Sequence, residues 1–64
     1  MNARLRKFYL THKEAEQALG CSYHTLWRMR QDGTFVEGTD WVTYLRRVYI
    51  KKTSIERFEK AALR

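Results

Sequence analysis

The chain has 64 residues, with 13 lysines and arginines against seven aspartates and glutamates, and its net charge of +6 favours a polyanionic partner. A chain of this length forms one small domain that buries only about 60% of its unfolded surface, which excludes a deep catalytic cleft of the usual size. The single cysteine excludes an internal disulfide and fits a reducing cytoplasm, and no apolar run matches a membrane span or a signal peptide.

The N-terminal segment predicts a basic arm over about residues 1–7, followed by a short strand or extended lead-in over residues 7–11. Thr11 and Glu14 then form a capping box, in which the threonine hydroxyl accepts from a backbone N–H and the glutamate reaches back. We therefore expect a helix over about residues 12–19.

The next segment predicts a second helix close behind the first. The first helix carries an apolar stripe of Ala15, Ala18 and Leu19. Gly20 suits the left-handed position that ends a helix, and Ser22 caps a second helix that runs to about Gln31 and stops at Asp32 and Gly33. Two short helices joined by a tight, glycine-containing turn are typical of a helix-turn-helix.

The remaining residues predict a hairpin and a third helix. An irregular segment anchored by Phe35 leads to "DWVTYLRRVYIKK", which indicates a two-stranded hairpin turning near residues 45–47, although no Gly or Asn defines the turn type. Thr53 and Glu56 repeat the capping box. The expected core positions of these elements are Trp41, Val48, Ile50, Ile55, Phe58 and Ala62. The predicted fold is α+β and mostly α, a small winged helix-turn-helix with a two-stranded wing and a C-terminal helix.

The second helix has an inward and an outward face. At about 100° per residue, Leu26 and Met29 lie on one side, flanked by Thr25 and Arg30. A helix this short buries one stripe, so we expect the opposite side to be displayed. That side carries His24, Trp27, Arg28 and Gln31, with Tyr23 at its border.

These displayed side chains suit a DNA groove. The second helix of a helix-turn-helix enters the major groove, where arginine matches the acceptors of guanine. Arg28 is the best candidate for a base contact, Tyr23 and His24 are candidates for a base edge or a phosphate, and Trp27 for a sugar or a thymine methyl. The alternatives are that Trp27 folds back over the first helix or the wing, and that His24 is a solvated surface histidine.

The predicted wing offers a second contact. Arg46 and Arg47 lie at its tip, and Lys51 and Lys52 lie on the return strand. Such a tip tracks a phosphate backbone or enters the minor groove, and the alternative is a solvated turn with the positive charge typical of edge strands. Further phosphate contacts are expected from the N-terminal arm, through Arg4, Arg6 and Lys7.

Other function classes find little support. The spacing of His12, Cys21 and His24 fits no structural zinc pattern, and the sequence has no phosphate-cradling glycine loop and no nucleophile–base arrangement. We therefore expect no enzymatic activity, cofactor or metal. A basic, soluble surface without a partner is the alternative explanation of the charge.

The stretches "YLTHKEAEQALGCSYHTLWRMRQDGTF", "GTDWV" and "RRVYIKKTSIERFE" resemble the excisionase-type winged helix-turn-helix group, which is related to the MerR DNA-binding domain and to AlpA-like regulators. The resemblance spans about residues 9–60. The matching positions are Thr11, Glu14, Ala15, Leu19, Ser22, Thr25, Leu26, Trp27, Arg28, Gly33, Arg47, Ile55 and Phe58. The chain departs from the group at Glu16, where a second alanine is common, in lacking a proline after the second helix, and in lacking a wing glycine.

The resemblance implies a function as a recombination directionality factor. Such a protein binds double-stranded DNA beside an attachment site, bends it, and directs an integrase toward excision, with cooperative self-association on DNA, in the cytoplasm of a bacterial or phage-infected cell. The recognition positions it implies are Tyr23, His24, Trp27 and Arg28 on the helix and Arg46 and Arg47 on the wing. A free-standing domain without the effector region of full-length MerR regulators is expected. The alternatives are a small AlpA-like or MerR-like transcription regulator and an adaptor that holds an integrase or another protein partner.

Overall fold

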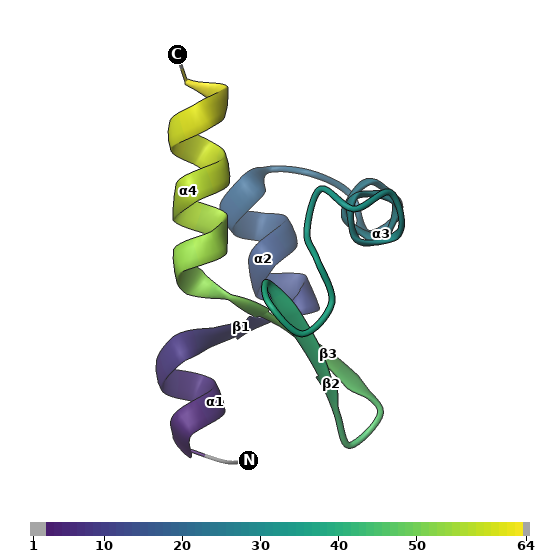
Figure 1. The fold of residues 1–64 in the computed structure, drawn as a ribbon, viewed down its shortest axis with the longest axis vertical. Helices are drawn as coiled ribbons and strands as arrows, with labels where there is room; N and C mark the ends of the chain where they lie inside the picture. Colours follow the sequence, from purple (N-terminus) through teal and green to yellow (C-terminus); the bar gives the residue numbers. More distant parts are fainter. Residues whose placement is uncertain (1–2, 64) are drawn as a thin grey trace.

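The computed structural model describes residues 3–63, with side chains from residue 5 onward, and contains four helices and three strands within that range (Figure 1). In chain order these are α1 (Ala3–Phe8), β1 (Tyr9–Thr11), α2 (His12–Leu19), α3 (Tyr23–Gln31), β2 (Trp41–Tyr44), β3 (Arg47–Lys51) and α4 (Lys52–Ala62). The fold is α+β, and roughly half of the chain is helical. No helix in the described range combines the length and the apolar character that crossing a membrane requires.

The N-terminal segment is helical where the sequence predicts an arm. Of the predicted arm, residues 3–7 belong to α1, and Met1 and Asn2 lie outside the described residues. Extended backbone begins only at Tyr9, and β1 pairs antiparallel with β3, with Leu10 opposite Ile50. Because Leu10 packs against the core, the pairing buries an apolar side chain that a free arm would expose. The predicted lead-in strand therefore joins the predicted two-stranded hairpin in one sheet of order β1-β3-β2, a pairing that the sequence did not predict.

The two central helices have the predicted bounds because their ends are set by local hydrogen bonds. The capping box of α2 is formed, with Glu14 N–H donating to Thr11 Oγ1 at 3.1 Å and Thr11 N–H donating to Glu14 Oε1 at 2.9 Å. Gly20 ends α2 with a left-handed φ of 67°, and Ser22 Oγ accepts from the backbone N–H of Thr25 at the start of α3. Figure 1 looks nearly along α3 while α2 lies across it, so the two helices cross steeply.

The β2–β3 hairpin closes through a two-residue turn. Tyr44 pairs with Arg47, which leaves Leu45 and Arg46 as the turn, both with positive φ, 50° and 65°. Positive φ at both central residues defines a type I′ turn, the type whose twist matches that of the flanking strands. The left-handed conformation costs a side-chain-bearing residue about 1–2 kcal/mol, so Asn and Gly are the usual choices.

One apolar cluster joins the helices to the sheet. Its buried members are Ala15, Leu26, Phe35, Trp41, Ile50 and Ile55, with Leu10, Leu19, Cys21, Met29, Val48 and Phe58 packed against them. Two expected core residues, Ala18 and Ala62, are exposed. They line an open hollow of about 210 Å³ between α2 and α4, because methyl groups are too short to close that gap.

Helix α4 begins earlier than predicted. Its first residue is Lys52, and its N-cap Lys51 makes no side-chain capping bond, so the predicted second capping box from Thr53 is wrong. Ser54, within the first turn, is buried and donates to Asp40 Oδ1 at 2.7 Å. A tertiary contact therefore fixes this helix start, where a local cap was expected.

Buried Asp40 holds the loop between α3 and β2 in place. Its carboxylate accepts from Val36 N–H at 2.9 Å, from the Ser54 hydroxyl and from Arg57 at 2.7 Å. Burial alone would raise the pKa of Asp40, but these hydrogen bonds and the Arg57 charge outweigh burial and hold the pKa below its ordinary value. The same loop returns to the core through Phe35, whose carbonyl accepts from Trp41 Nε1 at 3.0 Å. These bonds fix α3 relative to the hairpin.

Candidate nucleic-acid interface

Helix α3 displays the face that the sequence predicts. Leu26 is fully buried, whereas Trp27 is 40% exposed and Tyr23 is 58% exposed. His24, Arg28 and Gln31 are also exposed. The inward and outward sides of the helical wheel are therefore confirmed.

Trp27 packs within its own helix. Its ring stacks on the His24 ring, with 5.7 Å between centroids and 20° between planes. One turn from His24, an Arg28 guanidinium nitrogen lies 3.4 Å from His24 Nε2. Within the described residues this is the one hydrogen bond of the Arg28 side chain, so most of its donors face solvent. The three side chains form a flat, polar-edged surface on the outside of α3.

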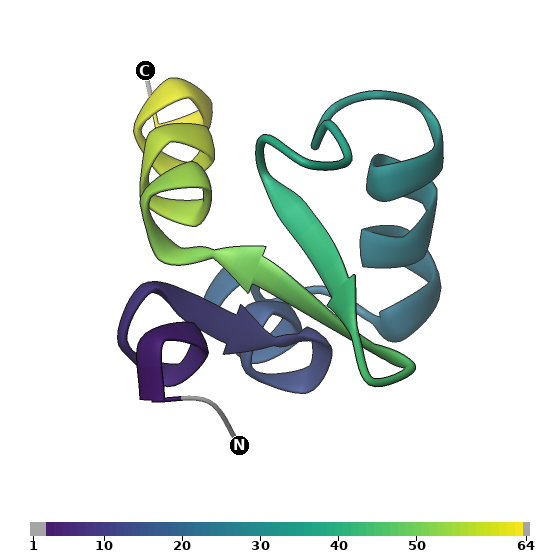
Figure 2. The same ribbon diagram turned by 60° about the horizontal axis from the view of Figure 1, so that its bottom comes forward.

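The start of α3 abuts the start of α2. The Tyr23 ring lies against His12, with 4.4 Å between centroids, and His12 Nδ1 is 2.6 Å from Glu16 Oε2. These contacts orient Tyr23 toward the hairpin side of the molecule. Figure 1 and Figure 2 together show that the hairpin turn is separated from α3 along the long axis of the molecule, so Tyr23 and the hairpin meet only at the hollow that their side chains line.

A basic hollow of about 270 Å³ joins these elements. Its lining comprises Tyr23 from α3, Arg46, Arg47 and Val48 from the hairpin, and Thr11, His12 and Lys13 from the start of α2. Three of these side chains are cationic and none is a carboxylate, so the hollow favours an anion. The structure thus brings the predicted helix residue Tyr23 and the predicted hairpin residues Arg46 and Arg47 to one place.

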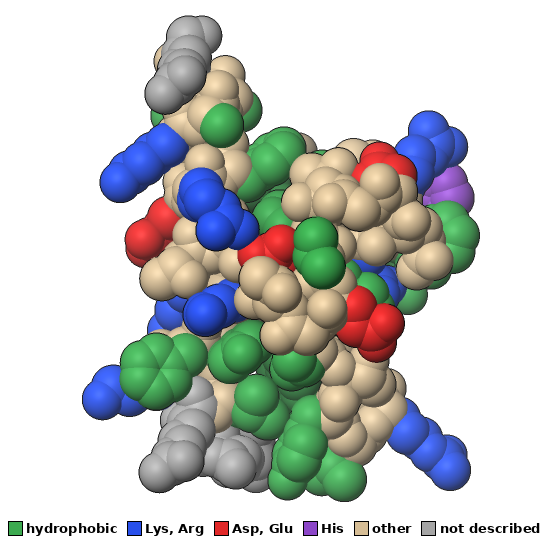
Figure 3. Space-filling view, viewed as in Figure 1, with side chains coloured by type: hydrophobic (Ala, Val, Ile, Leu, Met, Phe, Trp, Pro, Cys, Tyr) green, Lys and Arg blue, Asp and Glu red, His purple; other side chains and the backbone are tan. Residues whose placement is uncertain are grey.

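Lys13 belongs to this site and was missed by sequence reasoning. It follows the Thr11 cap, so the sequence could have placed it as an exposed cation in the first turn of the first helix. What the sequence did not reveal is that the hairpin, far along the chain, returns to this helix end. Figure 3 shows lysine and arginine side chains over α3 and near the end of the hairpin.

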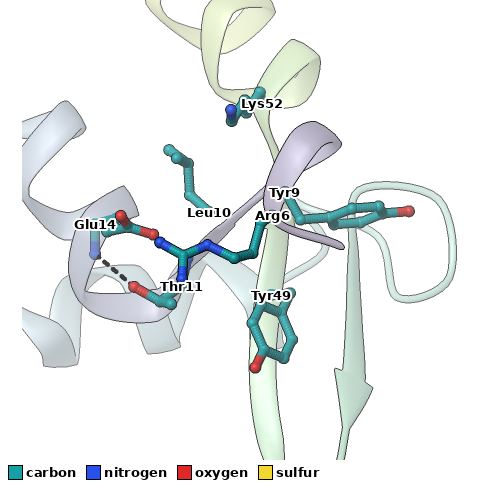
Figure 4. A pocket seen from close by; sticks show the side chains of 7 residues that line it. All are labelled: Arg6, Tyr9, Leu10, Thr11, Glu14, Tyr49 and Lys52. Carbon is teal, nitrogen blue, oxygen red and sulfur yellow. Dashed lines mark hydrogen bonds between the residues drawn. The ribbon is translucent and has the colours of Figure 1, made fainter. Parts of the chain in front are cut away.

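A larger hollow of about 400 Å³ lies on the other side of Thr11, between α1, the sheet and the start of α4 (Figure 4). Arg6 reaches into it toward Glu14, and Lys52 lies above. A hydrogen bond from Thr11 N–H is the main cause that lowers the pKa of Glu14, and Arg6 and Lys52 lower it further. Because this hollow holds an ionised carboxylate, it suits an anion less well than the smaller hollow does.

Several predicted cations lie away from the basic hollow. Lys52 and Arg6 line the larger hollow, and Lys7 Nζ lies 5.5 Å from the centre of the Phe8 ring. Lys51 ends β3 and is partly buried, and the side chain of Arg4 lies outside the described residues. Among those whose side chains are described, none lines the basic hollow.

Arg30 is a core residue that the sequence did not identify. It is only 9% exposed, and its guanidinium carbon lies 4.7 Å from the centre of the Trp41 ring. Its Nε is buried with no hydrogen-bond partner among the described residues. Stacking on tryptophan thus explains why this arginine is buried while Arg28 on the same helix is exposed.

Thiol reactivity and metal binding find little support among the described residues. Burial, with a further contribution from Glu16, raises the pKa of the Cys21 thiol, which disfavours the reactive thiolate. Among the described side chains, no three His, Cys, Asp or Glu gather closely enough to hold a metal ion.

No protein-family model, characterised protein or solved structure matches the chain. Its function must therefore be argued from its own residues.

Proposed function

We propose that this chain is a winged helix-turn-helix protein that binds double-stranded DNA in a sequence-specific manner. Helix α3 lies in the major groove, and the β2–β3 hairpin is the wing that reaches the adjacent minor groove. The observation that carries this proposal is the basic hollow, in which Tyr23 of the exposed α3 face lies beside Arg46 and Arg47 of the hairpin.

The helical shape of α3 and the cations of the basic hollow support the proposal. The major groove admits an α-helix, and the phosphate strand separates it from the minor groove. With α3 in one groove and the hairpin in the other, that strand crosses the basic hollow, where Lys13, Arg46 and Arg47 neutralise phosphates. The outward side chains Trp27 and Arg28 then face base edges.

The fixed loop supports a preformed interface. The bonds to Asp40 from Val36, Ser54 and Arg57 hold the segment that links α3 to β2. Little ordering is therefore needed on binding, which preserves affinity that a mobile hairpin would lose.

For the biological role, we propose an excisionase, or recombination directionality factor, that bends DNA beside an attachment site and directs an integrase toward excision. This finer proposal rests on the sequence resemblance. An AlpA-like regulator would use the same surface.

Specific DNA binding is tested by selection from a random pool of duplexes, which should enrich a defined sequence. Arg28→Ala should weaken binding to that sequence by about 1–3 kcal/mol while leaving random duplexes unaffected. The control is Lys60→Ala, which removes an exposed cation from α4 and should leave both affinities unchanged. If Arg28→Ala binds every duplex as the native protein does, the assigned recognition face is wrong.

The role is tested with a cognate integrase and a plasmid that carries its two hybrid attachment sites. Excision should require the protein. Tight, specific DNA binding with no effect on excision would contradict the excisionase role and favour the regulator.

A further inference from the structure

The hairpin turn carries an apolar side chain that the fold does not use. Leu45 is 77% exposed, and its neighbour Tyr44 is also exposed. Leu45 does not belong to the apolar cluster that forms the core. Figure 3 shows hydrophobic side chains at the end of the hairpin, beside basic ones. Folding therefore gives no reason for leucine at this position.

The backbone at Leu45 makes this choice more unusual. Its φ of 50° lies in the left-handed region, where Asn or Gly would fit with less strain. A strained backbone that exposes an apolar side chain points to an external contact. In the free protein, Leu45 is therefore less favourable for this turn than Asn or Gly, and its apolar side chain gains no stabilisation from burial.

The charge around Leu45 favours DNA over an apolar protein partner. Arg46 and Arg47 follow it directly and line the basic hollow with Tyr23 and Lys13. The turn therefore adjoins a hollow that Tyr23, at the start of α3, also lines. An apolar protein partner would meet several cations here, whereas DNA supplies phosphates for the arginines and stacked bases for the leucine.

We propose that Leu45 is a wedge that enters the minor groove, partly unstacks one base step and bends the duplex. Apolar wedges of this kind kink DNA toward the major groove, most readily at flexible pyrimidine–purine steps. This inference rests on the proposed DNA-binding function and adds the residue that produces the bend. Arg46 and Arg47 hold the neighbouring phosphates, which fixes the depth of the turn in the groove.

The test compares Leu45→Asn and Leu45→Met with the native protein. Asparagine tolerates the left-handed turn and removes the apolar side chain, whereas methionine keeps an apolar side chain of similar length. The matched control is Leu63→Asn, because Leu63 is also highly exposed but lies at the end of α4. The probe is the duplex that the native protein selects from a random pool. End-attached dyes report bending by energy transfer, and 2-aminopurine at successive adenines reports unstacking.

The native protein, Leu45→Met and Leu63→Asn should bend the duplex and raise the fluorescence of 2-aminopurine at one step. Leu45→Asn should bind with an affinity within about threefold of native, but it should neither bend the duplex nor raise the fluorescence of 2-aminopurine. Native bending by Leu45→Asn would overturn the wedge while leaving the DNA-binding proposal intact, and that result is also the one expected if the turn serves a protein partner. If the native protein selects no duplex, both proposals fall together.

Discussion

Leu26 and Trp27 are adjacent residues of α3 in opposite environments. Leu26 is fully buried in the core cluster, and Trp27 lies on the outside, stacked on His24. Buried and exposed positions therefore alternate between neighbouring residues of one helix, and the proposed function assigns recognition to the exposed one.

This division predicts opposite effects of two alanine substitutions. Leu26→Ala should lower the free energy of unfolding by about 2–5 kcal/mol, because it removes a buried side chain and leaves a cavity. Trp27→Ala should lower it by about 1 kcal/mol or less and weaken DNA binding. Urea unfolding and fluorescence anisotropy with the selected duplex measure the two quantities. A large loss of stability in Trp27→Ala would mean that this side chain serves packing.

The residue-scale features that were predicted correctly depend on neighbouring residues in the chain, whereas those that were missed depend on contacts between distant segments. The caps at Thr11 and Ser22 were predicted because each depends on residues within one helical turn. The burial of Arg30 was missed because its partner, Trp41, belongs to another element. The role of Asp40 was missed for the same reason, since Ser54 and Arg57 lie 14 and 17 positions further along the chain.

At the scale of elements, the loop before β2 connects the two parts of the candidate interface. Asp40 binds the loop backbone at Val36 and the first turns of α4 at Ser54 and Arg57. The loop in turn sets where the hairpin lies relative to α3. The candidate interface, which both elements form, therefore depends on the buried carboxylate of Asp40.

This dependence predicts a pH effect on stability. The pKa of Asp40 is lower in the folded protein than in the unfolded chain, where it is about 3.9. The stabilisation is therefore present above that unfolded value and is lost as the pH falls through the lower folded value. Asp40→Asn should cost about 1–3 kcal/mol at neutral pH, and its deficit should shrink toward about pH 2.

Urea unfolding of both proteins between about pH 2 and pH 6 provides the measurement. Glu14 and Asp32 also have lowered pKa values, so both proteins retain some acid sensitivity. The informative quantity is the difference between the two curves. A difference that stays constant across this range would contradict the role of the Asp40 charge.

The helices whose predicted caps form, α2 and α3, were predicted with their correct bounds, whereas the start of α4 was not, because its predicted capping box at Thr53 does not form. α2 and α3 match because their caps are local. The short strand before α2 was predicted as a strand or extended lead-in, but its pairing with the hairpin was missed because the pairing of Leu10 with Ile50 joins distant segments. The position of the hairpin turn was predicted. Its type I′ geometry was not predicted, because Leu45 and Arg46 are not residues typical of that turn.

At the scale of the whole molecule, the charge of +6 is divided between different surfaces. Lys13, Arg46 and Arg47 line the basic hollow, whereas Arg6 and Lys52 lie around the other hollow with Glu14. Net charge alone therefore overstates the number of cations at the candidate interface.

This distribution predicts the salt dependence of DNA binding. If Lys13, Arg46 and Arg47 each neutralise one phosphate, the logarithm of the association constant should fall with the logarithm of salt concentration with a slope of about −2.7 or steeper. Lys13→Ala should make the slope shallower by about 0.9, whereas Lys60→Ala on α4 should not change it. Titrations between about 50 and 200 mM salt measure these slopes. Equal slopes for both variants would exclude Lys13 from the interface.

The central claim is that α3 and the β2–β3 hairpin together contact one DNA duplex. The most direct test is to follow the backbone amide signals of isotope-labelled protein by NMR while the selected duplex is added. The account predicts that the largest shifts occur along α3 and in the hairpin turn, and that the exposed end of α4 changes little. Shifts that cluster between α2 and α4, around Ala18 and Ala62, with α3 unchanged, would contradict it.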